Sequence, residues 1–546
     1  MPSTRTILVC GIAALVATAA QTASAAQASA PLWGRWEGSF EAQAFADPGT
    51  ELELELTPPS GKARKGVGFW DGGTTWRARV MPDEPGTWRY RTRSRPVVAG
   101  LDAQEGSFVC RPGEPATSVM RHGAIRVASG QYHLEHADSR PFFWLGDTVW
   151  NGPLLSEADD WAHFLKDRAE KRFTVIQFNA IAPWRTAPTD GEGQVALVAE
   201  KGRLEINPRY FRRLDQRMNA INDQGLVAAP VLLWANQRED LGNTLSEEDA
   251  IRLIRYQVAR YGAHHVAWIL AGDNSYKGKS SERWKRIGRA VFGESPHAPV
   301  TTHPTGMNWP WESWREERWL DFLGDQSGHG DDAGTLRWIH SGPPHEHWRT
   351  EPHRPVINLE PPYEDHRAYQ SRQPHSAYNV RRAVYWSLLS TPTAGVTYGA
   401  HGIWSWQTET GKEPRGHAGT GIARPWREAM ALPGSEQMKH VAELFTALPW
   451  TRLRPDQELL TRQPGGDDPA HFVGSARTEE GDLAILYLPV GGEVSLQSQR
   501  LANTISAQWI DPRTGKRVPA RSESDFRYRA PDNQDWILLL QKSTKP

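Results

Sequence analysis

Two acidic residues in this sequence each follow directly on an apolar run with the length of a β-strand. Asp273 comes after the run at 266–272, and Glu360 comes after the run at 356–359. Two carboxyl groups flanking a glycosidic bond cleave it when one protonates the leaving oxygen and the other attacks the anomeric carbon or activates water. For each acid alone, the alternative is an ion pair or a helix cap. Hydrolysis by this mechanism therefore requires the side chains of Asp273 and Glu360 to lie close enough to flank one glycosidic bond.

The predicted ends of the other strands also carry polar and aromatic side chains. Carboxyl, amide and imidazole groups hydrogen-bond to hydroxyls, and aromatic faces stack on sugar rings, so together they suit a polyhydroxylated ligand. The candidates for substrate contact are Asp147, Trp150, Asn179, Trp234, Asn274, His303, Gln326, His329, Tyr363, Tyr398 and Trp404. Two alternatives stay open: Asp147 equally suits a cap on the next helix, and Glu364 either orients Glu360 or takes over its role.

Strand-length apolar runs alternate with helical segments through the middle of the chain. The runs are 142–146, 174–179, 227–234, 266–272, 300–303, 320–326, 356–360 and 395–401. The helical segments include 157–171, 208–223 and 246–261. This alternation predicts an α/β fold, a (β/α)8 TIM barrel over residues 120–440. Because reacting groups lie at the carboxyl ends of barrel strands, and strands four and seven face each other, Asp273 and Glu360 are expected across one cleft.

The segments on either side of the barrel have the pattern of β-domains. Glu and Leu alternate over 51–56, which is typical of a strand with one buried face, and turn signals follow at 58–61 and 71–73. Strand-like runs occur again at 483–488, 506–510 and 536–540. We therefore expect an N-terminal β-sandwich over 31–115 and a small C-terminal β-sandwich over 445–546.

The first residues have the pattern of a signal peptide. Arg5 precedes an apolar run at 7–20, and Ala-Ser-Ala at 23–25 suits cleavage. This predicts a signal peptide over 1–25 and a secreted or periplasmic protein without membrane association after cleavage, because no later apolar run is long enough to span a bilayer. Of the 2 cysteines, Cys10 lies in this segment and Cys110 has no partner for an intrachain disulfide.

The amino-acid composition argues against some classes of binding partner and in favour of others. The formal net charge of -1 argues against a nucleic-acid binder, which needs a surplus of Lys and Arg to neutralise phosphates. The 25 Trp residues pack in cores or form platforms for sugars. His340, His345, His347 and His353 match no zinc spacing, so no metal and no cofactor are expected. The expected partner is a polysaccharide or oligosaccharide substrate, and the protein is expected to be a monomer.

Several motifs resemble those of a known family, in the same order along the chain. They lie at 136–138, 141–150, 268–274, 326–329, 355–364 and 397–402. Together they resemble the apiosidase-like barrel of glycoside hydrolase family 140, over residues of about 120 to 435. The N-terminal segment resembles the β-sandwich of domain-of-unknown-function family 5060. The last segment resembles the family's C-terminal β-domain, which carries a collagen-binding label.

The resemblance implies a hydrolase of side chains of plant or microbial polysaccharides. It also implies that Asp273, on strand four, is the acid/base and that Glu360, on strand seven, is the nucleophile, with retention of configuration. This chain has Ala271 where the family usually has Gly, and Pro362 where the family often has Cys. Neither difference changes a reacting group, but both bear on substrate identity.

Two other functions compete with hydrolysis by two carboxyl groups. A non-catalytic carbohydrate-binding protein on an enzyme-like barrel would explain the Trp content. A metal-dependent hydrolase would use the His-rich loop at 340–353. Turnover of any glycoside excludes the first alternative, and activity that survives a strong chelator excludes the second.

Overall fold

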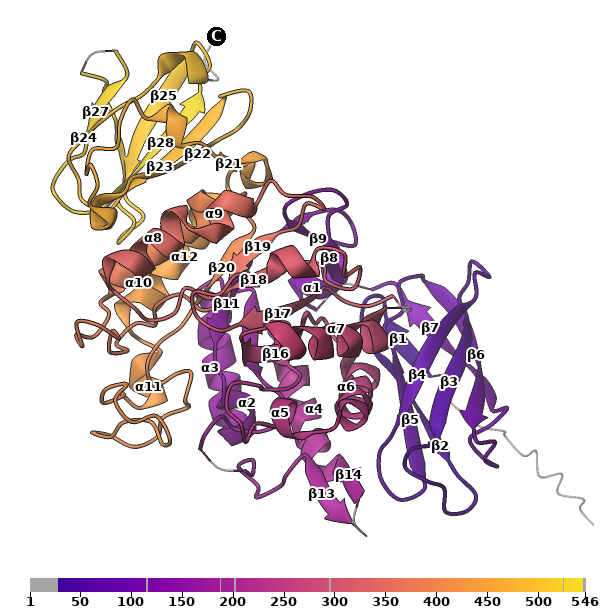
Figure 1. The fold of residues 1–546 in the computed structure, drawn as a ribbon. Coiled ribbons are helices and arrows are strands. Elements are labelled where there is room, and N and C mark those ends of the chain that lie inside the picture. The colour runs from indigo at the N-terminus through magenta and orange to yellow at the C-terminus, as the bar shows by residue number, and fades with distance from the viewer. Residues whose placement is uncertain are drawn as a thin grey trace, which may run out of the picture.

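The computed structural model describes residues 28–113, 116–186, 188–200, 203–293, 296–523 and 525–543. The predicted signal peptide at 1–25 lies outside the described residues. Figure 1 shows three regions in chain order: an N-terminal β-region in indigo, a central α/β region from magenta to orange, and a C-terminal β-region in yellow at the opposite side of the molecule.

Seven strands form the N-terminal region. They pair in the order β1-β7-β6-β3-β4-β5-β2. Trp36 from one end of this order stacks on Phe108 near the other end, with ring centroids 4.5 Å apart, so the sheet folds over itself into two packed layers. The strands are β1 (Ser29–Pro31), β2 (Trp36–Glu41), β3 (Glu51–Thr57), β4 (Arg64–Trp70), β5 (Thr75–Val80), β6 (Gly86–Arg95) and β7 (Glu105–Arg111).

Eight parallel strands form the central sheet, which confirms the predicted barrel. Their order is β17-β16-β15-β12-β11-β20-β19-β18. The ends of this order meet, because the Gly324 N–H of β18 donates to Thr301 Oγ1 of β17 over 3.0 Å. The strands are β11 (Trp144–Thr148), β12 (Val175–Asn179), β15 (Val227–Val231), β16 (Trp268–Asn274), β17 (Val300–Pro304), β18 (Leu323–Asp325), β19 (Val356–Asn358) and β20 (Gly395–Tyr398).

The helices surround this barrel, and local sequence sets their ends. In α6, Ser246 accepts a hydrogen bond from the Asp249 N–H, which satisfies one of the N–H groups left free at the start of the helix. The helices are α1 (Ser118–His122), α2 (Gly152–Leu155), α3 (Ala158–Glu170), α4 (Pro208–Asp223), α5 (Leu241–Thr244), α6 (Glu247–Tyr261), α7 (Gly278–Phe292), α8 (Ala333–Ser341), α9 (Pro343–His347), α10 (Ala377–Ser390), α11 (Trp426–Ala429) and α12 (Pro433–Thr446).

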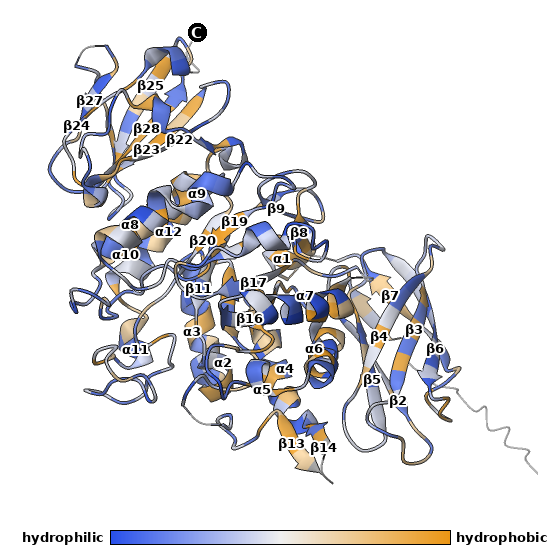
Figure 2. Ribbon diagram, in the orientation of Figure 1, coloured by the Kyte–Doolittle hydropathy of each residue, from blue (hydrophilic) through white to orange (hydrophobic). Residues whose placement is uncertain are grey.

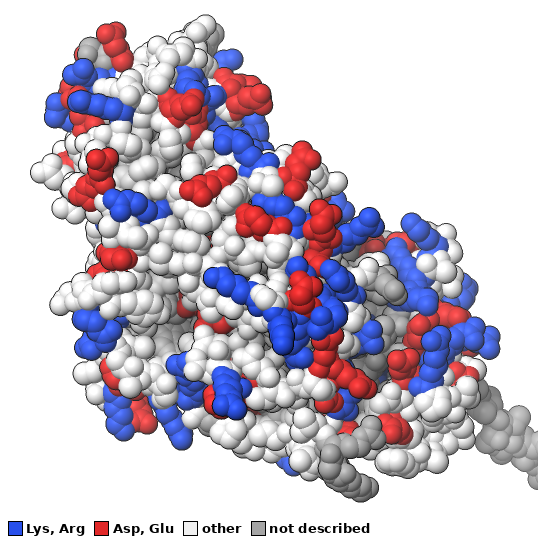
Figure 3. Space-filling model, in the orientation of Figure 1, with Lys and Arg blue, Asp and Glu red and all other residues white. Residues whose placement is uncertain are grey.

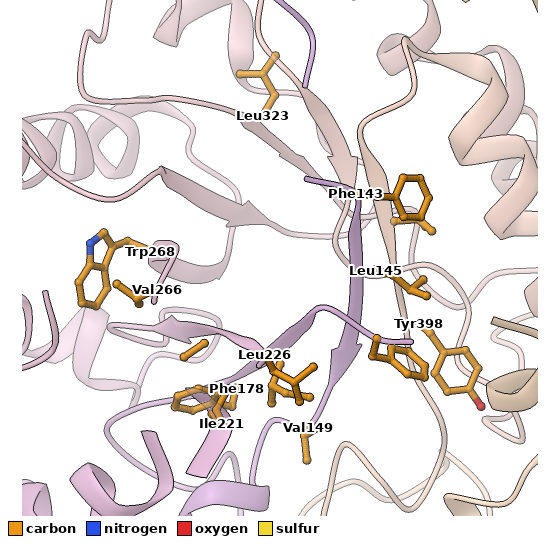
Figure 4. Close-up of a cluster of buried hydrophobic side chains, with 14 of the residues drawn as sticks. Phe143, Leu145, Val149, Phe178, Ile221, Leu226, Val266, Trp268, Leu323 and Tyr398 are labelled. Carbon is orange, nitrogen blue, oxygen red and sulfur yellow. The ribbon is translucent and has the colours of Figure 1, made fainter. Parts of the chain in front are cut away.

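Alternate residues of each barrel strand face either the axis or the helices. Leu145, Val149 and Phe178 belong to the core between strands and helices, which Figure 4 shows in close-up. Hydrophobic colour concentrates on the barrel strands around β19, whereas the outer side of α7 is hydrophilic (Figure 2). The residues that point toward the axis at the carboxyl ends of the strands are therefore the ones that can meet in one site.

Two small groups of strands lie outside the barrel sheet: a three-stranded sheet that precedes β11 and a hairpin that follows β12. The predicted first strand, 142–146, is too early, because Pro141–Phe142 pairs with Leu134–Glu135 in a separate antiparallel sheet and β11 begins at Trp144. The separate strands are β8 (Ile125–Val127), β9 (Leu134–His136) and β10 (Pro141–Phe142), and a hairpin is formed by β13 (Leu197–Glu200) and β14 (Arg203–Ile206).

The C-terminal region is a six-stranded sheet with a two-stranded ribbon around one apolar core. Its predicted strand at 483–488 is found with the same bounds. The strands are β21 (Arg454–Pro455), β22 (Gly474–Arg477), β23 (Leu483–Leu488), β24 (Glu493–Ser495), β25 (Ile505–Ile510), β26 (Arg517–Pro519), β27 (Arg527–Arg529) and β28 (Trp536–Lys542). It docks on α10, where Arg381 holds Asp535 in a two-point ion pair at 2.6 and 2.7 Å.

Buried ion pairs join the N-terminal region to the barrel. Arg260 of α6 lies 2.9 Å from Asp71, which follows β4, and 2.6 Å from Asp215 of α4. Arg79 of β5 reaches the same Asp215 carboxylate at 2.7 Å. Arg260 is fully buried, so the two regions share one desolvated charge network. Within the described ranges, no helix has both the length and the apolar character that crossing a bilayer requires.

We predict that Arg260→Met lowers the free energy of unfolding by about 3–5 kcal/mol, because it leaves two buried carboxylates without their shared cation. Urea unfolding followed by tryptophan fluorescence measures the effect. Arg255→Met is the matched control, since Arg255 lies exposed on the same helix and donates only to the Ala290 carbonyl. Equal midpoints for the two variants would contradict this account of the interface.

Candidate active site

Asp273 stands at an irregular point of β16. The pairing of β16 with β17 shifts register at Gly272 and again before Asn274, and Asp273 has a φ of 54°. A non-glycine residue in this left-handed region carries backbone strain, and bulges of this kind re-aim side chains next to functional sites. The carboxyl of Asp273 accepts a hydrogen bond from the Asn236 amide, which lies beyond β15.

Glu360 lies two residues beyond β19 and is held by two imidazoles. His329 Nε2 lies 3.0 Å from Glu360 Oε1, and His303 Nε2 lies 3.3 Å from Oε2. His329 Nδ1 accepts from the Tyr363 N–H over 3.3 Å, so the ring proton of neutral His329 is on Nε2 and points at the carboxylate. This arrangement donates a hydrogen bond to Glu360 without requiring His329 to be charged.

The surroundings push the pKa values of the two acids apart. Burial, followed by the charge of Glu360, raises the pKa of Asp273 to about 7. Burial would raise the pKa of Glu360 as well, but the hydrogen bonds from His303 and His329 outweigh it and lower that pKa to about 2. Below about pH 7 the site therefore holds one proton on Asp273 and a negative charge on Glu360. The geometry agrees, because Gly272, next to Asp273, pairs with His303, whose ring lies 3.3 Å from Glu360.

An aromatic wall lines the rest of the site. Trp150 contacts Trp234 at 5.1 Å between ring centroids and His303 at 5.5 Å. Trp184 contacts Trp234 at 5.0 Å and Trp404 at 5.8 Å. The wall thus continues from the ends of β11 and β15 around to the loop after β20. In Figure 3, the visible face has a hollow between α11 and α7 with acidic atoms at its floor.

Several buried polar atoms along this wall have no hydrogen-bond partner among the described residues. Buried polar atoms are normally paired in the protein, and unpaired ones grouped at one place are typical of a site that binds a polar ligand. They are Nε1 of Trp150, Trp184 and Trp234, both amide atoms of Asn179, Oε1 of Gln326 and Nδ1 of His303. The donors and acceptors together suit hydroxyl groups, which both donate and accept.

The structure brings together most of the residues predicted from strand ends. Trp150, Trp234, His303, His329, Tyr363 and Trp404 join Glu360 through the contacts above and through the 4.4 Å contact of the His329 and Tyr363 rings. Asn179 and Gln326 contribute the unpaired polar atoms, and they are also buried.

Three of the predicted contact residues are directed elsewhere, which corrects those predictions. Asp147 is 0% exposed and forms a 2.5 Å ion pair with Arg168 of α3, on the helix side of β11. Tyr398 belongs to the same core between strands and helices as Leu145, near which Figure 4 shows it, and its hydroxyl donates to Glu364 over 2.6 Å. Both face away from the axis because of their place in the strand alternation.

Asn274 is the third of these residues. Its side-chain oxygen accepts from the Tyr276 N–H at 2.9 Å and from the Ser280 hydroxyl at 2.6 Å, and its amide donates to the Ala235 carbonyl at 3.0 Å. Both polar atoms of the Asn274 side chain therefore hold the loop that follows Asp273 in place.

The alternatives for Glu364 are also decided by contacts. Its second oxygen accepts from the Gly434 N–H at 3.0 Å, at the start of α12. Tyr398 and Gly434 thus occupy both oxygens on the helix side, and Glu364 ties the end of the barrel to α12.

Strand-end reasoning missed residues of the candidate site that stand on long loops. Trp184 and Arg185 follow β12 by several residues, and His417 lies in the loop after β20, where its ring contacts Trp184 at 4.4 Å. Tyr369 is exposed, and its ring contacts that of His329, the partner of Glu360, at 5.6 Å between centroids. Asn236 lies two residues after Trp234 and shares its strand end, but it is not among the predicted contact residues.

The His-rich loop does not form a metal site in the described part of the chain. His340 stacks on Phe472 at 4.0 Å, His353 stacks on Tyr132 at 4.7 Å, and His345 hydrogen-bonds to the Ser390 carbonyl. In these ranges, no three His, Cys, Asp or Glu side chains converge as metal ligands do.

A cavity of about 810 Å³ follows the loop after Asp273. It is lined by Tyr276, Lys277, Gly278, Lys279, Ser281, Glu282, Arg286, Trp309, Pro310, Glu312 and Ser313. The carboxyl groups of Asp273 and Glu360 are not part of its lining. It is a neighbour of the site that these two acids define.

Comparisons with known proteins agree with this fold. The sequence model described as "Apiosidase-like, catalytic domain" matches residues 128–452. The model of a domain of unknown function, DUF5060, matches residues 29–95, and "Putative collagen-binding domain of a collagenase" matches residues 454–541. No curated protein matches the chain.

Solved structures of low sequence identity share the architecture. One described as "Glycoside hydrolase" has a TM-score of 0.68 and 21% identity, over 78% of this chain and 98% of that one. A glycoside hydrolase family 5 from Bacteroides vulgatus ATCC 8482 has a TM-score of 0.67 and 21% identity, over 78% and 94% of the two chains. "A putative glycoside hydrolase" from the same organism has a TM-score of 0.70 and 19% identity, over 95% and 100%. At such identities, the likeness establishes the fold alone.

Proposed function

Since the chain belongs to the apiosidase-like family, a family of glycoside hydrolase-like proteins, we propose that it hydrolyses O-glycosidic bonds with Asp273 as acid/base and Glu360 as nucleophile. One observation carries the proposal. Two carboxyl groups with opposite protonation preferences share one site, which is walled by aromatic rings and unpaired polar atoms. Two-carboxylate hydrolysis needs this asymmetry, because one group must hold a proton while the other is ionised.

In the first step, protonated Asp273 gives its proton to the glycosidic oxygen as that oxygen leaves the anomeric carbon. The carboxylate of Glu360 forms a bond to the same carbon, through a transition state with oxocarbenium character. In the second step, ionised Asp273 takes a proton from water, the water oxygen bonds to the anomeric carbon, and the bond to Glu360 breaks. The sugar leaves with its original configuration, and both side chains return to their starting states.

We further propose that the substrate is a side chain of a plant or microbial polysaccharide and that the protein is exported and monomeric. The family supports the substrate class, and the aromatic wall supports a sugar ligand. The signal-like segment at 1–25 supports export to the periplasm or the medium. A non-catalytic carbohydrate-binding protein is the second candidate, supported by the same wall but not by the separated pKa values.

A screen against pectic and other plant polysaccharides, with analysis of released sugars, tests the proposal. Release of a sugar by the purified protein supports hydrolysis, and binding without release supports the second candidate. Proton NMR of the first anomer formed then tests retention. Retaining enzymes have carboxyl groups about 5–5.5 Å apart and inverting enzymes about 6.5–9.5 Å.

The pKa values predict the pH dependence of hydrolysis. Activity requires the protonated form of Asp273, whose pKa of about 7 lies above its ordinary value, so kcat/KM is expected to fall as pH rises through about 7. Ionised Glu360 is required as well, and its lowered pKa keeps the acidic limb below the ordinary range of a glutamate. A pH profile of kcat/KM measures both limbs. Activity that continues to rise above about pH 8 would contradict the assignment of the acid.

A further inference from the structure

Asn236 is bound on both sides of its amide. Its Nδ2 donates to Asp273 Oδ2, and its Oδ1 accepts from Arg185 Nη2 over 3.3 Å and from Gln237 Nε2. A guanidinium only donates, so the amide oxygen of Asn236 must face Arg185 and the amide N–H must face Asp273. In the hydrogen bond between the two side chains, the Asn236 amide is therefore the donor and the Asp273 carboxyl is the acceptor.

The hydrogen bond distinguishes the two oxygens of Asp273. Protonated carboxyl groups have one carbonyl oxygen and one hydroxyl oxygen, and the carbonyl oxygen is the better acceptor. Because Oδ2 accepts from Asn236, the proton of neutral Asp273 belongs on Oδ1. The groups whose charge or hydrogen bonding acts on this carboxyl are Glu360, His303, Asn236 and Arg185.

Arg185 is itself held in place. Its guanidinium lies over the Trp184 ring, 5.1 Å from the centroid, and its φ is 55°. A Cβ at Gly416 would lie 2.1 Å from the Arg185 carbonyl oxygen, so only glycine allows the loop after β20 to approach this closely. The loop after β12 and the loop after β20, which are distant in sequence, thus pack together and fix the position of Arg185, which in turn orients Asn236.

We propose that Asn236, oriented by Arg185, is a positioning residue that keeps the transferable proton of Asp273 on Oδ1, toward the leaving oxygen. This inference rests on the proposed function and extends it to residues that do not take part in bond breaking. Removing Asn236 frees the proton to occupy either oxygen, and it also removes a hydrogen bond that favours the ionised form of Asp273.

The test compares pH profiles of kcat and KM for the wild type, Asn236→Ala, Arg185→Met and Arg238→Met, on a substrate that the wild type turns over. Arg238 is the matched control, because it is exposed in the same loop as Asn236. In Asn236→Ala we expect kcat to fall about 10-fold or more with KM nearly unchanged. We also expect the alkaline limb to move up by about one pH unit, with the acidic limb unmoved.

Arg185→Met is expected to shift the alkaline limb in the same direction by a smaller amount, and Arg238→Met not to shift it. Alkaline limbs that coincide in all four proteins would overturn the inference while leaving hydrolysis intact. A wild type without turnover contradicts the proposed function instead. Carboxyl ¹³C NMR of labelled aspartate, assigned with Asp273→Asn, then decides the inference without substrate: an unchanged Asp273 titration in Asn236→Ala overturns it.

Discussion

Replacing Asp273 with Asn is expected to lower kcat on a polysaccharide by about 10²–10⁴-fold while the fold survives. The asparagine has nearly the same shape but no proton to give to a leaving alkoxide. The loss of kcat/KM, which reports the first step, should be much smaller for aryl glycosides with acidic phenol leaving groups, because those groups depart without protonation. Parallel kinetics on the two kinds of substrate measure the difference.

Asp159→Asn provides the control for this experiment, since Asp159 is exposed in the first turn of α3. It should retain wild-type kinetics, and circular dichroism should show that both variants are folded. A uniform loss on both kinds of substrate would indicate that Asp273 binds or supports the site and does not act as the acid.

The second large effect is expected for Glu360→Gln, which should lower kcat by about 10⁴-fold or more on every substrate. The amide cannot form the covalent intermediate, so an easier leaving group gives no rescue. The amide NH₂ could also be placed against the His329 Nε2–H, from which the carboxylate accepts in the wild type. Steady-state kinetics on the polysaccharide and on aryl glycosides measure the loss.

Glu346→Gln is the control for Glu360→Gln, because Glu346 is exposed on α9. Near-normal turnover by Glu360→Gln would require another nucleophile. Glu364 would be the nearest in sequence, but both of its oxygens are engaged on the helix side.

The sequence was sufficient to predict the barrel and the positions of both acids. Apolar runs report burial on both faces of a parallel strand, and an acid directly after such a run marks its carboxyl end. Asp273 and Glu360 were found in this way, as were His303 and His329. The same rule failed for Asp147 and Tyr398, because it finds residues near the carboxyl end of a strand but does not tell whether each side chain faces the barrel axis or the helices.

The loops were the part that sequence reasoning could not reach. Trp184 meets His417 across more than two hundred residues of sequence, and only the closed barrel brings the two loops together. The bulge at Gly272 is likewise a tertiary feature, since it appears only in the pairing of β16 with β17. Contacts of this kind have no periodic signal in a single sequence.

Comparing sugar release from the active polysaccharide by the wild type and by the double variant Asp273→Asn, Glu360→Gln tests the central claim most directly. We expect the wild type to release sugar and the folded double variant to release none above background over the same time. Equal release by both proteins would show that these two carboxyl groups do not perform the hydrolysis.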